Sequence, residues 1–260
     1  MDPIRIAVAG AAGRMGRTII RCVVEDCDCR LAGAIENTGS AFVGSDAGVL
    51  SGASETGVAI TAECASSFDA ADALVDFTVP VASVELAQQA ADHRVAHVIG
   101  TTGFSQEQEA RIEAASEKTV IIKSGNMSLG ANVLVALVAK AAKSLCDFDV
   151  QIVEMHHRMK KDAPSGTALM LGRAVADGRG LARYLDDCTQ GNGDIGFASL
   201  RGGTVVGEHS VIFAGTNERL ILEHVAEDRA IFARGAIAAA KWARGQKPGL
   251  YTMLDVLGLT

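Results

Sequence analysis

Two adjacent histidines and a lysine, His156, His157 and Lys160, lie just before a Pro-Ser-Gly-Thr stretch that ends at Thr167. A histidine titrates near neutral pH and can donate a proton, and a lysine adds a positive charge. Proline is tolerated in the first turn of a helix, and serine can cap one. Gly166 and Thr167 are therefore expected to begin a helix whose free N–H groups attract anions. The segment predicts a site that binds an anionic carboxylate and supplies it with a proton.

Two other interpretations of the histidine pair remain open. The two side chains could be ordinary loop histidines bonded to the backbone, or they could bind a metal ion. No cysteine or third ligand stands at zinc-site spacing from them, so the sequence predicts no metal. Cations are concentrated in residues 156–161 of an otherwise acidic chain, which favours an anionic ligand over a merely solvated surface.

The first residues of the chain predict a dinucleotide site. An apolar run over residues 4–9 meets three glycines, a helix-forming stretch follows, and a second apolar run, 31–35, ends at Glu36. Glycines allow a tight turn and a close approach to pyrophosphate, and an acidic residue after the second strand accepts ribose hydroxyls. A glycine turn in some other α/β protein is the alternative, and the surrounding pattern disfavours it. The predicted cofactor-binding residues here are Gly10, Ala11, Ala12, Gly13, Arg14, Met15, Gly16 and Glu36.

Further apolar runs alternate with helical stretches. The predicted strands cover 74–78, 96–99 and 119–122, and a charged helix is expected over 105–117. This alternation indicates a parallel, doubly wound sheet, in which ligands bind at the carboxyl ends of strands. Polar residues stand at those ends and are predicted to contact the cofactor: Thr78, Thr101, Thr102 and Asn126. Each could instead simply cap a helix, but their shared location favours binding.

The pattern changes after residue 128. A helix is expected over 130–144, a strand over 148–154 before the histidine loop, and a helix from 164 to 175. Strands are predicted over 197–206, 210–214 and 219–225, separated by turns at 207–209 and 215–217, which indicates a mostly antiparallel sheet. A helix over 231–242 and the tail 250–259 are expected to return to the first domain. The fold class is therefore α/β: a Rossmann-like domain, residues 1–128 completed by 229–260, and an α+β domain over 129–228.

Composition narrows the classes of protein. The chain has 260 residues, 48% apolar and 21% charged, which argues against extended disorder. A net charge of −7 argues against non-specific nucleic-acid binding. The longest apolar stretch, 131–139, is too short to span a bilayer, and no leader peptide is expected. Six scattered cysteines, of which Cys27 and Cys29 are the closest pair, are interpreted as reduced thiols of a cytoplasmic protein.

The motif from Glu154 to Ala168 resembles the signature of the 4-hydroxy-tetrahydrodipicolinate reductase family, also called dihydrodipicolinate reductase. Four further segments match that family in order, so the resemblance covers essentially the whole chain: Gly10–Arg17, Phe77–Pro80, Gly100–Phe104 and Gly249–Leu257.

The resemblance implies that NADH, NADPH or both reduce a cyclic dicarboxylate to tetrahydrodipicolinate in lysine and diaminopimelate synthesis. It implies His156 as the general acid, Lys160 as its partner, and Gly166 and Thr167 as the holders of a substrate carboxylate. The remaining implied contacts are His157 and Thr102 to the substrate and Phe77, Gly100 and Met127 to the cofactor. Family members are typically homotetramers built through the sheet of the second domain. Where some members carry arginine after the acidic residue, this chain has Asn37, which favours NADH.

Two other functions remain as alternatives. The chain could be a different two-domain NAD(P)-dependent dehydrogenase that acts on a small amino acid or a sugar, or a non-catalytic module that senses NAD. The long histidine–lysine motif disfavours the first, and the intact acid and cation positions disfavour the second.

Overall fold

A computed structural model describes residues 2–181 and 195–260. Contacts divide the chain into two compact units, one formed by the residues up to Ser128 together with Ala230–Gly258, and the other by Leu129–Arg229. Cys188 lies outside the described residues. In the part of the chain that is described, every helix is too short or too polar to cross a membrane.

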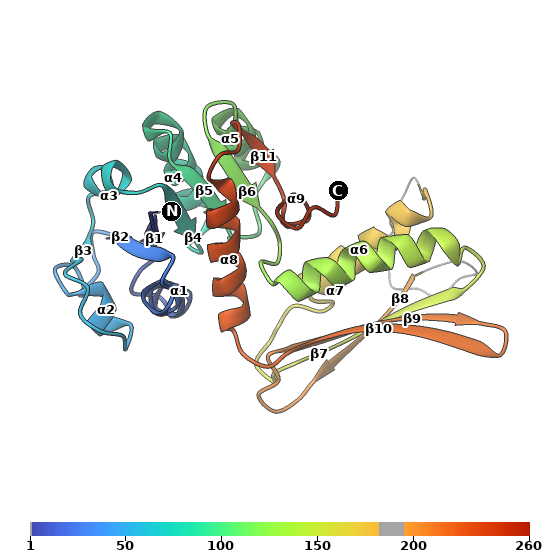
Figure 1. Cartoon of the computed structure of the whole chain (residues 1–260). Helices are drawn as coiled ribbons and strands as arrows, with labels where there is room; N and C mark the ends of the chain where they lie inside the picture. The colour runs from blue at the N-terminus through green and yellow to red at the C-terminus, as the bar shows by residue number, and fades with distance from the viewer. Residues whose placement is uncertain (1, 182–194) are drawn as a thin grey trace. The chain divides into compact units, whose positions relative to one another are not determined.

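The first unit is built on a seven-stranded sheet in the order β11-β6-β5-β4-β1-β2-β3, with every pair parallel (Figure 1). Helices α1 and α8 cover one face, and α3, α4 and α5 cover the other. This arrangement confirms the predicted Rossmann-like, doubly wound sheet. The elements are β1 (Ile4–Ala9), α1 (Arg14–Glu25), β2 (Cys29–Ile35), α2 (Ala47–Leu50), β3 (Ile60–Thr61), α3 (Ala65–Ala70), β4 (Ala73–Asp76), α4 (Pro80–His93), β5 (Ala96–Ile99), α5 (Gln106–Ser116), β6 (Val120–Lys123), α8 (Ala230–Ala243), β11 (Gly249–Tyr251) and α9 (Met253–Val256).

Local sequence explains where these elements begin and end. The central strands are short apolar runs because helices bury both of their faces; all four residues of β4 and of β5 are buried. Helix α4 begins with Pro80, which needs no N–H there. Ser105 and Gln108 form a capping box at the start of α5. Helices α1, α4 and α5 each follow a strand after a short loop, and these loops line the carboxyl ends of β1, β4 and β5.

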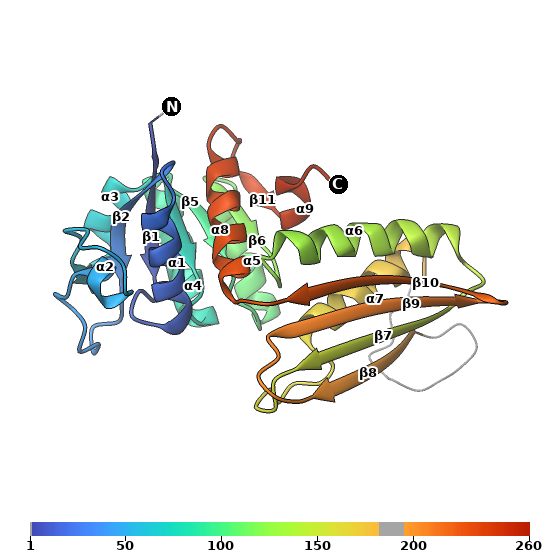
Figure 2. The same ribbon diagram turned by 60° about the horizontal axis from the view of Figure 1, so that its bottom comes forward.

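The second unit is a four-stranded sheet covered on one face by two helices that pack against each other, α6 and α7 (Figure 2). The strand order is β10-β9-β7-β8; β10 with β9 and β9 with β7 are antiparallel, and β7 with β8 is parallel. The elements are α6 (Leu129–Ser144), β7 (Asp149–His156), α7 (Gly166–Gly178), β8 (Ile195–Arg201), β9 (Gly207–Gly215) and β10 (Glu218–Ala226). The mostly antiparallel sheet is confirmed.

Strand β7 carries the residues of the predicted site on its core-facing side. Val150 and Ile152 are fully buried in the core that α6 and α7 form with the sheet. Because successive side chains alternate across a strand, Glu154 and His156 point to the same side. Glu154 is 1% exposed and His156 8%. The core-facing side of the sheet thus becomes polar where Glu154 and His156 of β7 and His209 of β9 meet the start of α7.

Three sequence predictions in this unit are wrong. The strand expected over 197–206 ends at Arg201, and the turn expected over 207–209 is instead the beginning of β9. The chain reverses earlier because Gly203 has a left-handed backbone, φ +50°, which glycine adopts without strain. Strand β9 then pairs with β7 down to Met155 opposite Glu208. Strand β7 does not end at 154 but continues through His156, because Met155 and His156 still pair with Leu200 and Arg201 of β8.

Candidate active site

His156 is held by a buried carboxylate. Its Nδ1 lies 2.5 Å from Glu154 Oε2. Arg201 donates to both oxygens of Glu154, with Nη1 and Nη2 each at 2.8 Å. Its Nη2 also donates to the carbonyl oxygen of Asp162 at 2.7 Å. An ionised carboxylate only accepts hydrogen bonds, so the proton of a neutral His156 ring must be on Nδ1, which leaves Nε2 for a ligand. Gly207 keeps space beside that atom, because a Cβ there would lie 3.0 Å from His156 Nε2.

The charges of this cluster follow from its burial and its hydrogen bonds. Burial raises the pKa of Glu154, but hydrogen bonds from Arg201, Ser199 and His156 outweigh it and lower the pKa to about 2. Burial lowers the pKa of His156 below its ordinary value; Glu154 opposes this shift, and Lys160 and Arg201 add to it. Near neutral pH the site therefore contains an ionised Glu154, and the lowered pKa of His156 favours the neutral form of its ring.

Ser165 connects the histidine cluster to the start of α7. Its backbone N–H donates to Glu154 Oε1 at 3.3 Å, and its Oγ accepts the N–H of Ala168 at 3.1 Å as the helix cap. The same Oγ lies 2.9 Å from Nε2 of His209, a residue of β9 that is 4% exposed. Burial lowers the pKa of His209 to about 4, so this ring is neutral. The predicted helix start at Pro-Ser-Gly-Thr is confirmed.

Lys160 and His157, the other two predicted residues of the histidine segment, each have a charged neighbour. Lys160 Nζ lies 2.7 Å from Asp162 Oδ2, and its charge acts on His156. A hydrogen bond from Lys160 lowers the pKa of Asp162. His157 Nε2 lies 3.4 Å from Nη2 of Arg229.

The start of α7 is open to a ligand. A Cβ built on Gly166 would meet no atom within 4 Å, so there is space above the first turn. Thr167 is the next residue of that turn. In the second unit, Glu154 and Ser165 connect His156 to the start of α7, and the charge of Lys160 acts on His156. Thr102, another predicted substrate residue, belongs to the first unit.

The glycine turn of the first unit has the geometry expected of a pyrophosphate cradle. Gly10 is left-handed at φ +67°, and a Cβ on Gly16 would lie 2.1 Å from the carbonyl oxygen of Gly10, so only glycine fits both positions. Gly13 is the N-cap of α1 and supplies no side chain to it. The N-terminus of α1 therefore presents bare backbone N–H groups, which suits an anion. Ala11 is buried, and Arg14 is exposed beside the turn.

Glu36 closes this turn from the end of β2. Its Oε2 accepts the N–H of Ala12 at 3.0 Å, and its Oε1 accepts both the backbone N–H and the side-chain Nδ2 of Asn37, at 3.0 and 2.8 Å. The carboxylate is therefore already oriented, with one of its roughly four acceptor positions left over. A bare helix start beside an oriented carboxylate fits the pyrophosphate and the ribose of a dinucleotide.

A buried polar network joins the ends of β4 and β5. Asp76, fully buried, accepts Thr78 N and Oγ1 at 2.8 and 2.7 Å and lies 3.3 Å from His97 Nε2. Ser83 Oγ donates to Thr101 Oγ1 at 2.9 Å. Two predicted cofactor residues, Thr78 and Thr101, are thus held rigidly by neighbours that sequence patterns did not single out.

The remaining predicted cofactor residues are placed as follows. A Cβ on Gly100 would lie 2.3 Å from the Phe77 ring, so these two residues pack directly on each other. The side chain of Asn126 accepts the N–H of Ser128 at 2.8 Å. The side chain of Met127 is 1% exposed and belongs to the hydrophobic core, so only its backbone can contact a ligand.

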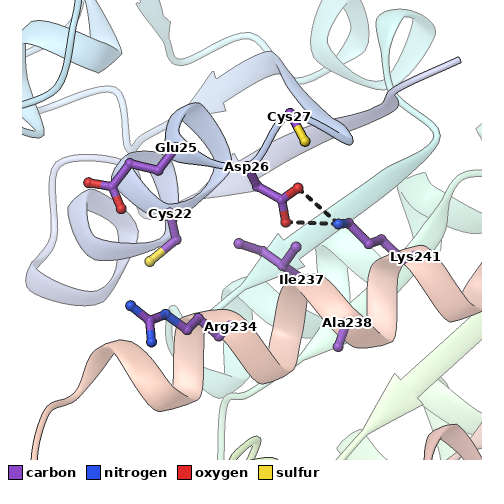
Figure 3. Close-up of a pocket in the computed structure, with 8 residues that line it drawn as sticks. All are labelled: Cys22, Glu25, Asp26, Cys27, Arg234, Ile237, Ala238 and Lys241. Carbon is purple, nitrogen blue, oxygen red and sulfur yellow. Dashed lines mark hydrogen bonds and ion pairs between the residues drawn. The ribbon is translucent and has the colours of Figure 1, made fainter.

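A separate pocket of about 490 Å³ lies between α1 and α8 (Figure 3). Its lining is mixed in charge: Cys22, Glu25, Asp26, Cys27, Arg234, Ile237, Ala238 and Lys241. Among the described residues, the one group with metal-ligand geometry is Asp26, Cys27 and Asp28. Lys241 occupies both of its carboxylates, at 2.8 and 3.3 Å. The described cysteines are all free thiols, as expected.

Comparison with known proteins shows the family to which the chain belongs. The family model described as "Dihydrodipicolinate reductase, N-terminus" matches residues 4–127, and its C-terminal counterpart matches residues 130–257. A protein of Parvibaculum lavamentivorans named 4-hydroxy-tetrahydrodipicolinate reductase is 55% identical over 266 residues, which is 98% of each chain. One of Brucella abortus with the same name is 56% identical over 264 residues, again 98% of each.

The fold has a solved counterpart. The structure of dipicolinate-bound dihydrodipicolinate reductase from Paenisporosarcina sp. TG-14 matches with a TM-score of 0.79 at 24% identity, covering 97% of this chain and 98% of that one. The parallel sheet, its glycine turn and Glu36 define an oxidoreductase with a nicotinamide dinucleotide-binding unit. More narrowly, the chain belongs to the dihydrodipicolinate reductase family.

Proposed function

We propose that this protein is a 4-hydroxy-tetrahydrodipicolinate reductase, which uses NADH or NADPH to form tetrahydrodipicolinate in lysine and diaminopimelate synthesis. The observation that carries the proposal is the His156–Glu154–Arg201 cluster beside the start of α7, in a chain that shares more than half of its residues with reductases of that name. A bound cofactor would supply a hydride and the cluster the matching proton, and the 4-hydroxyl of the substrate leaves as water.

His156 is the proton donor in this proposal. Hydride addition to an unsaturated ring leaves negative charge that a nearby acid must neutralise. Because its Nδ1 is bonded to Glu154, His156 presents Nε2 to the ring. Burial keeps its pKa low in the free protein, and a bound dicarboxylate raises that pKa, since an opposite charge favours the protonated form. The histidine is therefore loaded with a proton when the substrate is present.

The substrate carboxylates have two binding elements. The N–H groups of Gly166 and Thr167 at the open start of α7 donate hydrogen bonds to one of them, helped by the positive end of the helix dipole. Lys160 supplies a positive charge. It would leave its ion pair with Asp162 and pair with a substrate carboxylate instead. His157 accepts from Arg229 through Nε2, which leaves its Nδ1 to donate to the ligand. This set of cations and backbone donors suits a small dianion better than a neutral amino acid or sugar.

The residues of the first unit fit the cofactor. The uncapped start of α1 after Gly13 would hold the pyrophosphate, and Glu36 would hold the adenosine ribose. Thr78 and Thr101, fixed by the Asp76 network, would meet the carboxamide of the nicotinamide at the carboxyl ends of β4 and β5, and Thr102 follows Thr101 there. Because Glu36 would repel a 2′-phosphate and Asn37 is neutral, we expect kcat/KM for NADH to be at least equal to that for NADPH.

We propose that the open face of the second sheet is the subunit interface of a homotetramer. Met155 pairs with Leu200, and Ile212 pairs with Ile221, all on the face opposite α6 and α7. Leu200 and Ile221 are 50% and 54% exposed. A sheet face of this kind is typical of a subunit interface. Ile221→Lys is expected to yield smaller species in light scattering, whereas a monomeric wild-type protein would contradict the tetramer.

The activity is tested with the purified full-length chain in a coupled assay. Aspartate semialdehyde and pyruvate are condensed in situ by the preceding synthase, and nicotinamide oxidation is followed by absorbance. The proposal predicts oxidation that requires both precursors and the synthase. A folded protein that binds NADH but shows no precursor-dependent oxidation would contradict it, and a panel of amino acids and sugars serves as the control for other dehydrogenase activities.

A further inference from the structure

We propose that Arg17, stacked on Phe42, is the residue that recognises the 2′-phosphate of NADPH, so that the protein accepts both nicotinamide cofactors despite Glu36. The inference rests on the proposed function only in that a nicotinamide dinucleotide is the cofactor. All residues concerned belong to the first unit.

Arg17 and Glu36 are anchored to the same residue of the glycine turn. Arg17 Nε donates to the carbonyl oxygen of Ala12 at 2.9 Å, and the N–H of Ala12 donates to Glu36 Oε2 at 3.0 Å. The carbonyl of Ala12 thus holds the guanidinium of Arg17, and the N–H of Ala12 holds the carboxylate of Glu36. Both side chains lie at the turn that would bind the cofactor. A ribose bound to Glu36 brings its 2′ position into the neighbourhood of the guanidinium.

The guanidinium is oriented by an aromatic ring rather than by an acid. Its central carbon lies 4.9 Å from the centre of the Phe42 ring, and Phe42 is 39% exposed. Among the residues that the structure describes, no carboxylate forms an ion pair with Arg17, whereas Arg5 is paired with Asp72 at 2.7 Å. Stacking fixes the plane without using an N–H group, so four of the five donors of Arg17 remain for a ligand. A phosphate can take two of them at once.

The same geometry explains why neither cofactor should be excluded. Glu36 accepts a ribose hydroxyl of NADH and repels a 2′-phosphate, whereas Arg17 attracts that phosphate from the other end of Ala12. Removal of Arg17 leaves only the repulsive partner. Arg14 is a second cation of the turn, but it is exposed, and its side chain would have to be ordered on binding. Arg17 is already ordered.

The test is calorimetric titration of the full-length protein with two probes, 2′,5′-ADP and 5′-ADP, followed by NADPH and NADH. Arg17→Gln is expected to raise the Kd for 2′,5′-ADP about 10–150-fold, the usual effect of losing a charge-assisted contact, and the Kd for 5′-ADP less than about threefold. Arg17→Lys should restore part of the affinity for 2′,5′-ADP. Arg21→Gln removes the same charge from an exposed position one turn further along α1 and should change neither Kd.

Three results would overturn the assignment: equal losses for both probes in Arg17→Gln, no loss for 2′,5′-ADP, or a selective loss in Arg14→Gln in place of Arg17→Gln. If Arg17→Gln does not fold, Phe42→Leu decides the question, because it removes the ring and leaves the charge; a selective loss of about 3–10-fold for 2′,5′-ADP is expected, and an equal loss for both probes contradicts the proposal. Binding is measured without the dicarboxylate, so failure of the reductase activity would not affect the outcome.

Discussion

Replacement of Glu154 by glutamine tests the central cluster of the second unit. The change keeps the size of the side chain but removes the charge that faces two Arg201 nitrogens at 2.8 Å and the Nδ1 of His156 at 2.5 Å. A glutamine amide can accept only through its oxygen, so its NH₂ group must face a donor. Arg201, whose side chain is 21% exposed, then loses its ion pair and keeps only the backbone carbonyls of Asp162 and Leu200 as partners.

The expected loss of stability follows from the pKa of Glu154. The fall from an ordinary 4.5 to about 2 corresponds to about 3 kcal/mol of folding free energy near neutral pH. Because the folded-state pKa is the lower one, this contribution is fully present above pH 4.5 and is lost as pH falls towards 2. The difference between the wild-type protein and Glu154→Gln should therefore shrink to about 1 kcal/mol at pH 3.

The catalytic effect is expected in kcat. Without the carboxylate, the protonated ring of His156 loses a charge-assisted bond, which costs about 1.5–3 kcal/mol and lowers kcat about 10–150-fold. The KM for the dicarboxylate should change less than about threefold, because Glu154 contacts the imidazole of His156 and does not contact the substrate. Urea unfolding at the two pH values and steady-state kinetics measure both effects. Glu227→Gln, which removes an exposed carboxylate from the same unit, is the control. Unchanged kcat in folded Glu154→Gln would refute the reasoning.

Four further substitutions separate the roles of the site. His156→Gln should lower kcat about 10²–10⁴-fold with little change in KM, since a proton donor acts mainly in the transition state; wild-type kcat would end the acid assignment. Lys160→Ala should reduce kcat/KM about 10–150-fold through both constants, and values within about twofold of wild type would make this lysine a surface charge. Thr167→Pro deletes one N–H of the α7 start, so calorimetry should show poor binding of pyridine-2,6-dicarboxylate with near-normal NADH affinity; equal loss of both ligands would indicate general damage. Asn37→Arg should lower the KM for NADPH by offsetting the charge of Glu36, and a wild-type enzyme that already prefers NADPH more than tenfold would contradict this expectation.

Much of the first unit could be predicted from sequence because its signals are local. The apolar runs of β1, β4 and β5 are short and buried on both faces, and Gly10 and Gly16 stand where backbone geometry admits only glycine. The loop region between β2 and β4 carried weaker signals, and α2, β3 and α3, of four, two and six residues, were not predicted there. Elements this short lack a period that sequence patterns can reveal.

The support of His156 could not be predicted in the same way, because its members come from separate parts of the chain. Arg201 reaches Glu154 through the parallel pairing of β7 with β8, and His209 lies opposite Glu154 in the pairing of β7 with β9. The interpretation of residues 207–209 as a turn removed His209 from the sheet. One signal was present in the sequence: Glu154 and His156 continue the alternation of Val150 and Ile152, which places two polar side chains on a core-facing row.

The most direct test of the central claim follows the hydride itself. The purified protein is supplied with NADH deuterated at C4 on the transferred face and with substrate condensed in situ, and the product is analysed by mass spectrometry. The account predicts tetrahydrodipicolinate that carries one deuterium, with its formation reduced in His156→Gln in proportion to kcat. Consumption of NADH without a labelled ring, or a labelled product formed equally fast by His156→Gln, would contradict it.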